Sequence, residues 1–268
     1  MTNEATWPSQ PEDPNGNGEV RSWMTADELR QLAIEHPTLP TKYWGTAEER
    51  RQQVMLCAEF SFLFRTELLT EPADIPPMII NIDAEGWTRA RGNALPARAM
   101  NQEKQGAAID IMTEQQRLNI VEHVNVSAWS QMSIIWKKVK EGAAKKARAV
   151  VDYRIVNNYI SNSGWPIPNI SELLTRLGTF KPTRFCLIDL KDGYWQAPLH
   201  KDSRWITAFT VATLGMFHYL RVPMGIKCAA AYFQFMMATE VLVGLVFLIL
   251  EVYLDDIIVH DEGKGHTQ

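Results

Sequence analysis

The stretch Tyr253-Leu254-Asp255-Asp256 lies between two runs of strand-forming residues, 246–252 and 257–260. This pattern predicts a β-hairpin that carries two adjacent carboxylates at its tip. Like charges in contact repel each other, and a shared divalent cation removes that problem. Mg²⁺ prefers carboxylate oxygens, and two ions about 3.5–4 Å apart can hold the attacking and leaving oxygens of a phosphoryl displacement. The alternative is that Asp-Asp only favours a turn by bonding its own backbone.

A shared metal site needs a third carboxylate from elsewhere in the chain. Asp189 follows the apolar run 185–188 and is the obvious candidate. We therefore expect a strand that ends at Asp189 and lies beside the hairpin.

The charge of the chain is unevenly distributed. Residues 1–123 carry 11 Lys and Arg against 19 Asp and Glu, a net charge of −8. Residues 124–205 carry 13 against 6, a net of +7, and residues 206–268 carry 3 against 6, a net of −3. A basic middle segment inside an acidic chain is expected when only one surface contacts phosphates.

The composition indicates a globular intracellular protein of one or two domains. With 268 residues, 46% of them hydrophobic, the chain is long enough to bury a full core. Cys57, Cys186 and Cys228 have no zinc-site spacing and suit a reducing compartment, with one disulfide left open. The longest apolar run, 241–250, is far shorter than the roughly 20 residues of a membrane span, so we interpret it as buried core. We expect no secretion and no membrane partner.

The first half of the chain is predicted to be mostly helical. Residues 1–22 are rich in Pro, Gly, Asn and Glu and are predicted to be a disordered tail. The expected elements that follow are a short helix opened by Thr25 and Glu28, a helix over 46–69, a strand over 78–82, an irregular arm over 87–96 and a helix over 103–122. The apolar residues expected to face inward are Val54, Cys57, Phe60, Phe62 and Leu63 in the second helix, and Ala107, Ile111, Leu118 and Val121 in the third.

From residue 126 onward the chain changes to short β-branched runs. We expect a strand pair over 133–136 and 149–153, joined by the segment 137–148, which carries six cations and one anion. That segment is interpreted as a flexible basic hairpin, with a solvated charged loop as the alternative. The remaining expected elements are a helix over 170–177, strands over 206–213 and 216–222, and a helix over 229–242.

Four stretches in this order and spacing resemble the reverse transcriptase domain of long-terminal-repeat retrotransposons, close to the gypsy/Ty3 type. The resemblance covers roughly residues 77–260. The stretches are Val151-Asp152-Tyr153-Arg154-Ile155-Val156-Asn157, Leu187-Ile188-Asp189-Leu190-Lys191-Asp192-Gly193-Tyr194-Trp195-Gln196, Val222-Pro223-Met224-Gly225 with Phe233-Gln234, and Tyr253-Leu254-Asp255-Asp256.

The resemblance implies an α+β fold of the right-hand polymerase type. An antiparallel palm sheet backed by helices would carry the metals, and a β-rich fingers lobe would close over the nucleotide. Residues 23–76 would form a helical linker region before the polymerase, and 77–268 the fingers and palm. The chain stops 12 residues after Asp256, so the primer-gripping strands, the thumb, ribonuclease H and integrase of such polyproteins would be absent from it.

The resemblance also assigns the metal ligands. Asp189, Asp255 and Asp256 fall on the family's metal-binding aspartates, and the main-chain carbonyl of Leu190 would be a further ligand. The cofactor would be two Mg²⁺ ions, with Mn²⁺ as a substitute.

Other positions match the family's nucleotide-binding residues. Arg148 falls on the fingers arginine that contacts the triphosphate, and a planar, permanently charged fork suits that role. The fingers lysine is either Lys138 or Lys140. Asp192 and Gly193 match the stretch whose amides hold the phosphates. Tyr194 would exclude a 2′-hydroxyl by steric clash. Met224 stands where the family usually has Phe or Gln.

The implied reaction is attack of a primer 3′-hydroxyl on the α-phosphate of a deoxynucleoside triphosphate, with release of pyrophosphate. The partners would be an RNA or DNA template with its primer, and deoxynucleoside triphosphates. Such a protein would act in the cytoplasm, inside a retrotransposon particle, or in the nucleus. Two alternatives stay open: a catalytically dead retroelement remnant, and a non-enzymatic nucleic-acid-binding module that uses the basic segment 137–148.

Overall fold

The computed structural model describes residues 31, 34–36, 38, 40, 45–137, 145–161 and 165–261. The predicted tail, the helix after Thr25, and most of the basic segment lie outside these residues. The chain divides into two compact units, Met1–Leu68 and Leu69–Gln268. Each unit is described by itself.

The first unit contains one long helix, α2 (Ala47–Glu59). A capping box starts it: the Thr46 hydroxyl accepts from the amide of Glu49, and the Glu49 carboxylate accepts from the amide of Thr46. The expected extension to residue 69 is wrong, because the chain passes into a 3₁₀ turn, η1 (Ser61–Leu63). Aromatic residues and serine favour helix less than the residues of α2 do. Phe60, Phe62 and Leu63, expected in the core, are exposed.

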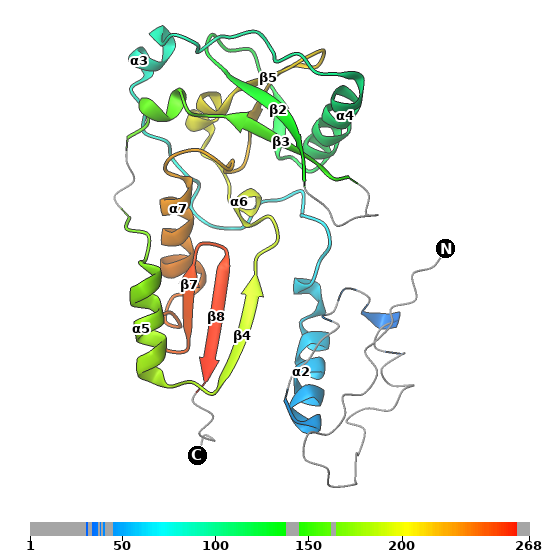
Figure 1. Cartoon of the computed structure of the whole chain (residues 1–268), viewed down its shortest axis with the longest axis vertical. Coiled ribbons are helices and arrows are strands. Elements are labelled where there is room, and N and C mark those ends of the chain that lie inside the picture. The colour runs from blue at the N-terminus through cyan, green and yellow to red at the C-terminus, as the bar shows by residue number, and fades with distance from the viewer. Residues whose placement is uncertain are drawn as a thin grey trace. The chain divides into compact units, whose positions relative to one another are not determined.

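The second unit contains a five-stranded sheet of order β1-β6-β5-β2-β3. All neighbours are antiparallel except β2 and β5, which are parallel. The strands are β1 (Val121–His123), β2 (Ser130–Trp136), β3 (Ala147–Asp152), β5 (Phe209–Val211) and β6 (Gly215–Tyr219). The helices near this sheet are α3 (Ala84–Arg89) and α4 (Gln102–Arg117), as Figure 1 shows. The predicted pairing of the strands around the basic segment is confirmed by the β2–β3 ladder.

A separate three-stranded antiparallel sheet has the order β4-β8-β7. Its strands are β4 (Arg184–Asp189), β7 (Leu250–Tyr253) and β8 (Asp256–Asp261). The helices α5 (Ile170–Phe180) and α7 (Ala229–Met236) lie beside β7, and β4 forms the opposite edge (Figure 1). A π-helical segment, η4 (Met237–Val241), continues α7. The predicted helix over 170–177, the strand ending at Asp189 and the terminal hairpin are all confirmed.

Short helical turns connect the two sheets. They are η2 (Val156–Asn158), α6 (Gly193–Gln196) and η3 (Lys201–Thr207). The strand expected over 206–213 is therefore reduced to β5, because Ile206 and Thr207 complete η3. Residues 78–82 form isolated bridges at Met78 and Ile82 instead of a strand.

Two predictions around α3 and α4 are also corrected. The expected irregular arm begins within α3, which ends at Arg89 and has Trp87 buried. Helix α4 ends at Arg117, because Asn119 has a positive φ of 52° and Val121 already belongs to β1. The buried residues within α4 are Ala108, Met112 and Gln115, so the expected Ala107 and Ile111 are only half-buried. Leu118 and Val121, which follow α4, are buried as predicted.

The prediction that residues 241–250 are buried core is wrong for most of the run. Leu250 is buried in β7, but Val243 and Leu248 are each 67% exposed. The chain reverses direction here, with positive φ at Gly244 and Phe247, and the strand begins only at Leu250. Residues 243–245 and 247–249 are therefore exposed, and the hydrophobic composition alone could not indicate that.

Candidate active site

The hairpin between β7 and β8 has a two-residue loop, Leu254 and Asp255. Tyr253 pairs with Asp256 across it. Leu254 has a φ of 57°, whereas Asp255 has no positive φ. A positive φ at the first central residue alone is the pattern of the type II′ turn, whose twist suits a β-hairpin. The turn therefore presents the two carboxylates at one end of the sheet.

A buried amide holds this turn in place. Gln234, on α7, is 2% exposed. Its Oε1 accepts from the amide of Leu254 at 2.7 Å, and its Nε2 donates to the carbonyl of Val252 at 3.2 Å. Gln234 belongs to a motif recognised in the sequence, but its contact with the hairpin could not be read from local pattern.

The third aspartate lies directly across the ladder from the hairpin. Asp189 of β4 is the register partner of Asp256 of β8, and the amide of Leu190 donates to the carbonyl of Asp255 at 3.1 Å. Opposite residues of an antiparallel pair have Cβ atoms about 4.5–5.5 Å apart on the same face, and two like charges there are unfavourable. Asp189 and Asp256 are exposed, and Asp255 is half-buried.

The side chains as they stand do not form a complete metal site. Within the ranges that the structure describes, no three His, Cys, Asp or Glu side chains are arranged to hold an ion. The backbone nevertheless places three carboxylates, which are hard oxygen donors of the kind Mg²⁺ prefers, on the adjacent strands β4 and β8 and on the turn that precedes β8. A cation between Asp189 and Asp256 would remove the repulsion between them.

Helix α6 lies against the hairpin. A Cβ on Gly193 would lie 3.0 Å from Cζ of Phe233 and 3.6 Å from Cβ of Asp255, so this position has little space for a larger residue. The Tyr194 ring stacks on Phe233 with 4.9 Å between centroids. Burial, followed by the nearby Asp255 and Tyr253, raises the pKa of Tyr194 above its ordinary value. Asp192, which precedes α6, has a φ of 49°.

A second group of predicted residues meets beside β3. The Arg148 guanidinium donates to Sδ of Met224. The turn that follows Met224 has a φ of 95° at Gly225, and Asn157 fixes it from both sides. The Asn157 Nδ2 donates to the carbonyl of Gly225 at 2.8 Å, and its Oδ1 accepts from the amide of Lys227 at 3.0 Å. Lys138 and Lys140 lie outside the described residues.

A cluster of ionic groups lies at the end of β3. Arg154 bonds Asp152 through both Nε and Nη2, at 2.8 and 2.7 Å, and Arg98 reaches the same carboxylate at 2.9 Å. The hydrogen bond from Arg154 lowers the pKa of Asp152 to about 2, with the charge of Arg98 contributing.

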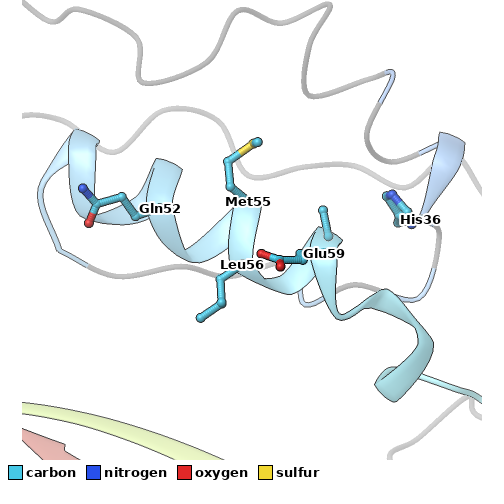
Figure 2. Close-up of a pocket in the computed structure, with 6 residues that line it drawn as sticks. His36, Gln52, Met55, Leu56 and Glu59 are labelled. Carbon is cyan, nitrogen blue, oxygen red and sulfur yellow. The ribbon is translucent and has the colours of Figure 1, made fainter.

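One surface hollow belongs to the first unit and contains none of the predicted site residues. Figure 2 shows it beside α2. Its lining residues are His36, Gln52, Met55, Leu56, Ala58 and Glu59.

Among the helices that the structure describes, none combines the length and the apolar character needed to cross a membrane.

Comparison with known proteins gives consistent matches. The family described as reverse transcriptase (RNA-dependent DNA polymerase) matches residues 135–268. The retrovirus-related Pol polyprotein from transposon 297 of Drosophila melanogaster is 39% identical over 126 residues, which are 47% of this chain and 12% of that protein. The Tf2-3 transposon polyprotein of Schizosaccharomyces pombe is 30% identical over 169 residues, which are 63% of this chain and 11% of that protein. The chain thus spans about a tenth of the length of these relatives.

Two solved structures share the fold. The foamy viral protease-reverse transcriptase in complex with RNA/DNA hybrid matches with a TM-score of 0.62 at 21% identity, over 87% of this chain and 29% of that one. The complex of its dRH form with double-stranded DNA gives 0.62 at 20% identity, over 88% and 38%. The expected fold class is confirmed: the chain has the mixed helix-and-sheet fold of these polymerases.

Proposed function

Because the chain belongs to the reverse transcriptase family, we propose that it is the fingers and palm of a retroelement polymerase that extends a primer with deoxynucleotides. The relatives are polyproteins, so we further propose that the chain works as one part of such a polyprotein. One observation carries the proposal: the register of β4 against β8 places Asp189 directly opposite Asp256, beside the turn that holds Asp255.

Reverse transcriptases in general use divalent metal ions. In this chain Asp189, Asp255 and Asp256, with the carbonyl of Leu190, would hold two Mg²⁺ ions. When bound, the ions lower the pKa of the primer 3′-hydroxyl and neutralise charge on the leaving pyrophosphate. The protein contributes the geometry, because Gln234 fixes the turn and the β4–β8 ladder fixes the distance between strands.

The nucleotide would lie between the hairpin and the fingers. Arg148, next to Met224, would bind the triphosphate, and the amides of Asp192 and Gly193 would bind its phosphates. The Tyr194 ring would lie under the sugar and reject a 2′-hydroxyl by steric clash, since stacking on Phe233 holds the ring in one orientation.

Template and primer would be held through phosphate contacts. The segment 124–205 has a net charge of +7, from 13 Lys and Arg against 6 Asp and Glu. Base pairing with the template, rather than base-reading side chains, would select each nucleotide. We propose both RNA and DNA as templates.

A primer-extension assay on a primed RNA template with Mg²⁺ tests the proposal. Asp255→Asn should reduce the extension rate below about one hundredth of wild type, because it removes charge stabilisation at the reacting phosphate. Asp261→Asn is the matched control, since this exposed aspartate lies at the opposite end of β8, and it should retain near wild-type extension.

Two other results would replace the proposal. Salt-sensitive binding of nucleic acid by wild type and Asp255→Asn alike, with no extension by either, would indicate a binding module that uses the basic segment. Neither binding nor extension by the wild-type protein would indicate a catalytically dead remnant.

A further inference from the structure

Glu251, in the middle of β7, is a buried carboxylate with no role in the proposed metal site. Its side chain is 1% exposed. In the described part of the chain it is the only Asp or Glu that is fully buried. A charge removed from water in this way is unfavourable unless it is paired and hydrogen-bonded.

Arg176 of α5 supplies that pairing. Its Nε and Nη2 donate to the two carboxylate oxygens of Glu251 at 3.0 and 2.9 Å, which is the bidentate arrangement of an arginine–carboxylate pair. Its guanidinium also lies 4.8 Å from the centroid of the Phe247 ring. Phe247 has a φ of 68°, which is unfavourable for a bulky side chain. One guanidinium therefore joins α5, β7 and the connection that precedes β7; we name Arg176, Phe247 and Glu251 the Arg176 cluster.

Glu251 lies on the face of the sheet that carries Asp189 and Asp256. Glu251 and Tyr253 are two residues apart in β7 and share a face. Tyr253 pairs with Asp256, which pairs with Asp189, so all four side chains belong to one face. Glu251 is thus three residues before Leu254, the first residue of the hairpin turn.

A buried ion pair adds little net stability over a well-packed apolar pair of similar size. The ion pair differs from an apolar pair in its geometric requirement, because two parallel hydrogen bonds form at only one position of β7 along α5. Apolar side chains in the same place would permit the strand to slide or tilt.

We propose that Arg176 and Glu251 are positioning residues, which hold β7 so that its turn presents Asp255 beside Asp189. The expected effect on primer extension rests on the proposed function, whereas the expected effect on the position of β7 does not. Displacement of a reacting group by about 1 Å can lower a rate by about a hundredfold.

The test replaces the ion pair by an apolar pair. Arg176→Met alone leaves Glu251 buried without its partner and should lower the unfolding midpoint. The double variant R176M/E251M should regain the wild-type midpoint, yet extend a primer about tenfold to a hundredfold more slowly, with an unchanged KM for the nucleotide. Arg176→Lys keeps the charge without the bidentate fork and should give an intermediate rate.

The matched control is E114M/R117M, a bidentate pair on the surface of α4 with bonds of 2.7 and 2.8 Å. This double variant should change neither the unfolding midpoint nor the rate. If R176M/E251M is folded and extends primers at the wild-type rate, the pair has no positioning role.

Hydrogen exchange keeps the inference testable even if the wild-type chain does not extend primers. In folded R176M/E251M, the amides of residues 250–256 should exchange faster than in wild type, while those of β2 and β3 stay unchanged. Equal exchange in the hairpin would overturn the proposal. If the double variant does not fold, Arg176→Lys gives the same comparison, because lysine keeps a charge opposite Glu251 but lacks the bidentate fork.

Discussion

Replacing Gln234 by leucine should loosen the hairpin that carries Asp255 at a measurable free-energy cost. The change removes the acceptor of the Leu254 amide and the donor to the Val252 carbonyl. A buried polar group without a partner costs about 1–3 kcal/mol. Val252 is buried and Leu254 half-buried, so we expect the free energy of unfolding to fall by about 2–4 kcal/mol.

This loss can be measured by thermal unfolding followed by circular dichroism. For a chain of this size, each kcal/mol lowers Tm by about 2–4 °C, so Gln234→Leu should lower Tm by about 4–16 °C. In hydrogen exchange, the Leu254 amide should lose more protection than the other amides of the hairpin, because it donates the hydrogen bond that the substitution removes.

Gln115→Leu is the matched control. Gln115 is also a buried glutamine on a helix, but its Oε1 has no hydrogen-bond partner. Leucine removes that unpaired atom and should change the free energy of unfolding by less than about 1 kcal/mol, or stabilise the chain. If Gln234→Leu is as stable as wild type, or no less stable than Gln115→Leu, the assigned role of Gln234 is wrong.

Three further substitutions test other parts of the structure. Gly193→Ala should slow primer extension by about tenfold or more, because the new methyl group displaces Phe233; an unchanged rate would contradict this close packing. Asp152→Asn should destabilise the chain at pH 7, because a carboxyl with a lowered pKa stabilises the folded state at pH values above its ordinary pKa of 3.8. In urea unfolding, the difference in free energy of unfolding between wild type and variant should shrink as the pH falls towards about 2. A difference that does not change with pH would contradict this prediction. Arg221→Met should lower the free energy of unfolding by more than about 4 kcal/mol, because this buried guanidinium donates to five main-chain carbonyls. A loss below about 1 kcal/mol in urea titrations would show that these five hydrogen bonds do not stabilise the fold.

Local pattern was sufficient for several elements of the fold. The hairpin at Asp255, the β2–β3 pair, α5 and the strand ending at Asp189 follow from residue types and spacing that hold wherever the segment lies. Local pattern failed where neighbours decide the outcome. The apolar connection before β7 is mostly exposed, and α4 buries Ala108 and Met112 instead of the adjacent Ala107 and Ile111.

The residue order alone determined the family and singled out the three aspartates proposed as metal ligands, because motif residues and their spacing are properties of the chain itself. Only the tertiary structure decided that Asp256 is the partner of Asp189, that Gln234 holds the turn, and that Arg176 neutralises Glu251. Each of these contacts joins residues that are between 20 and 75 positions apart in the sequence. Such pairings depend on how whole elements pack against each other, and no local propensity encodes them.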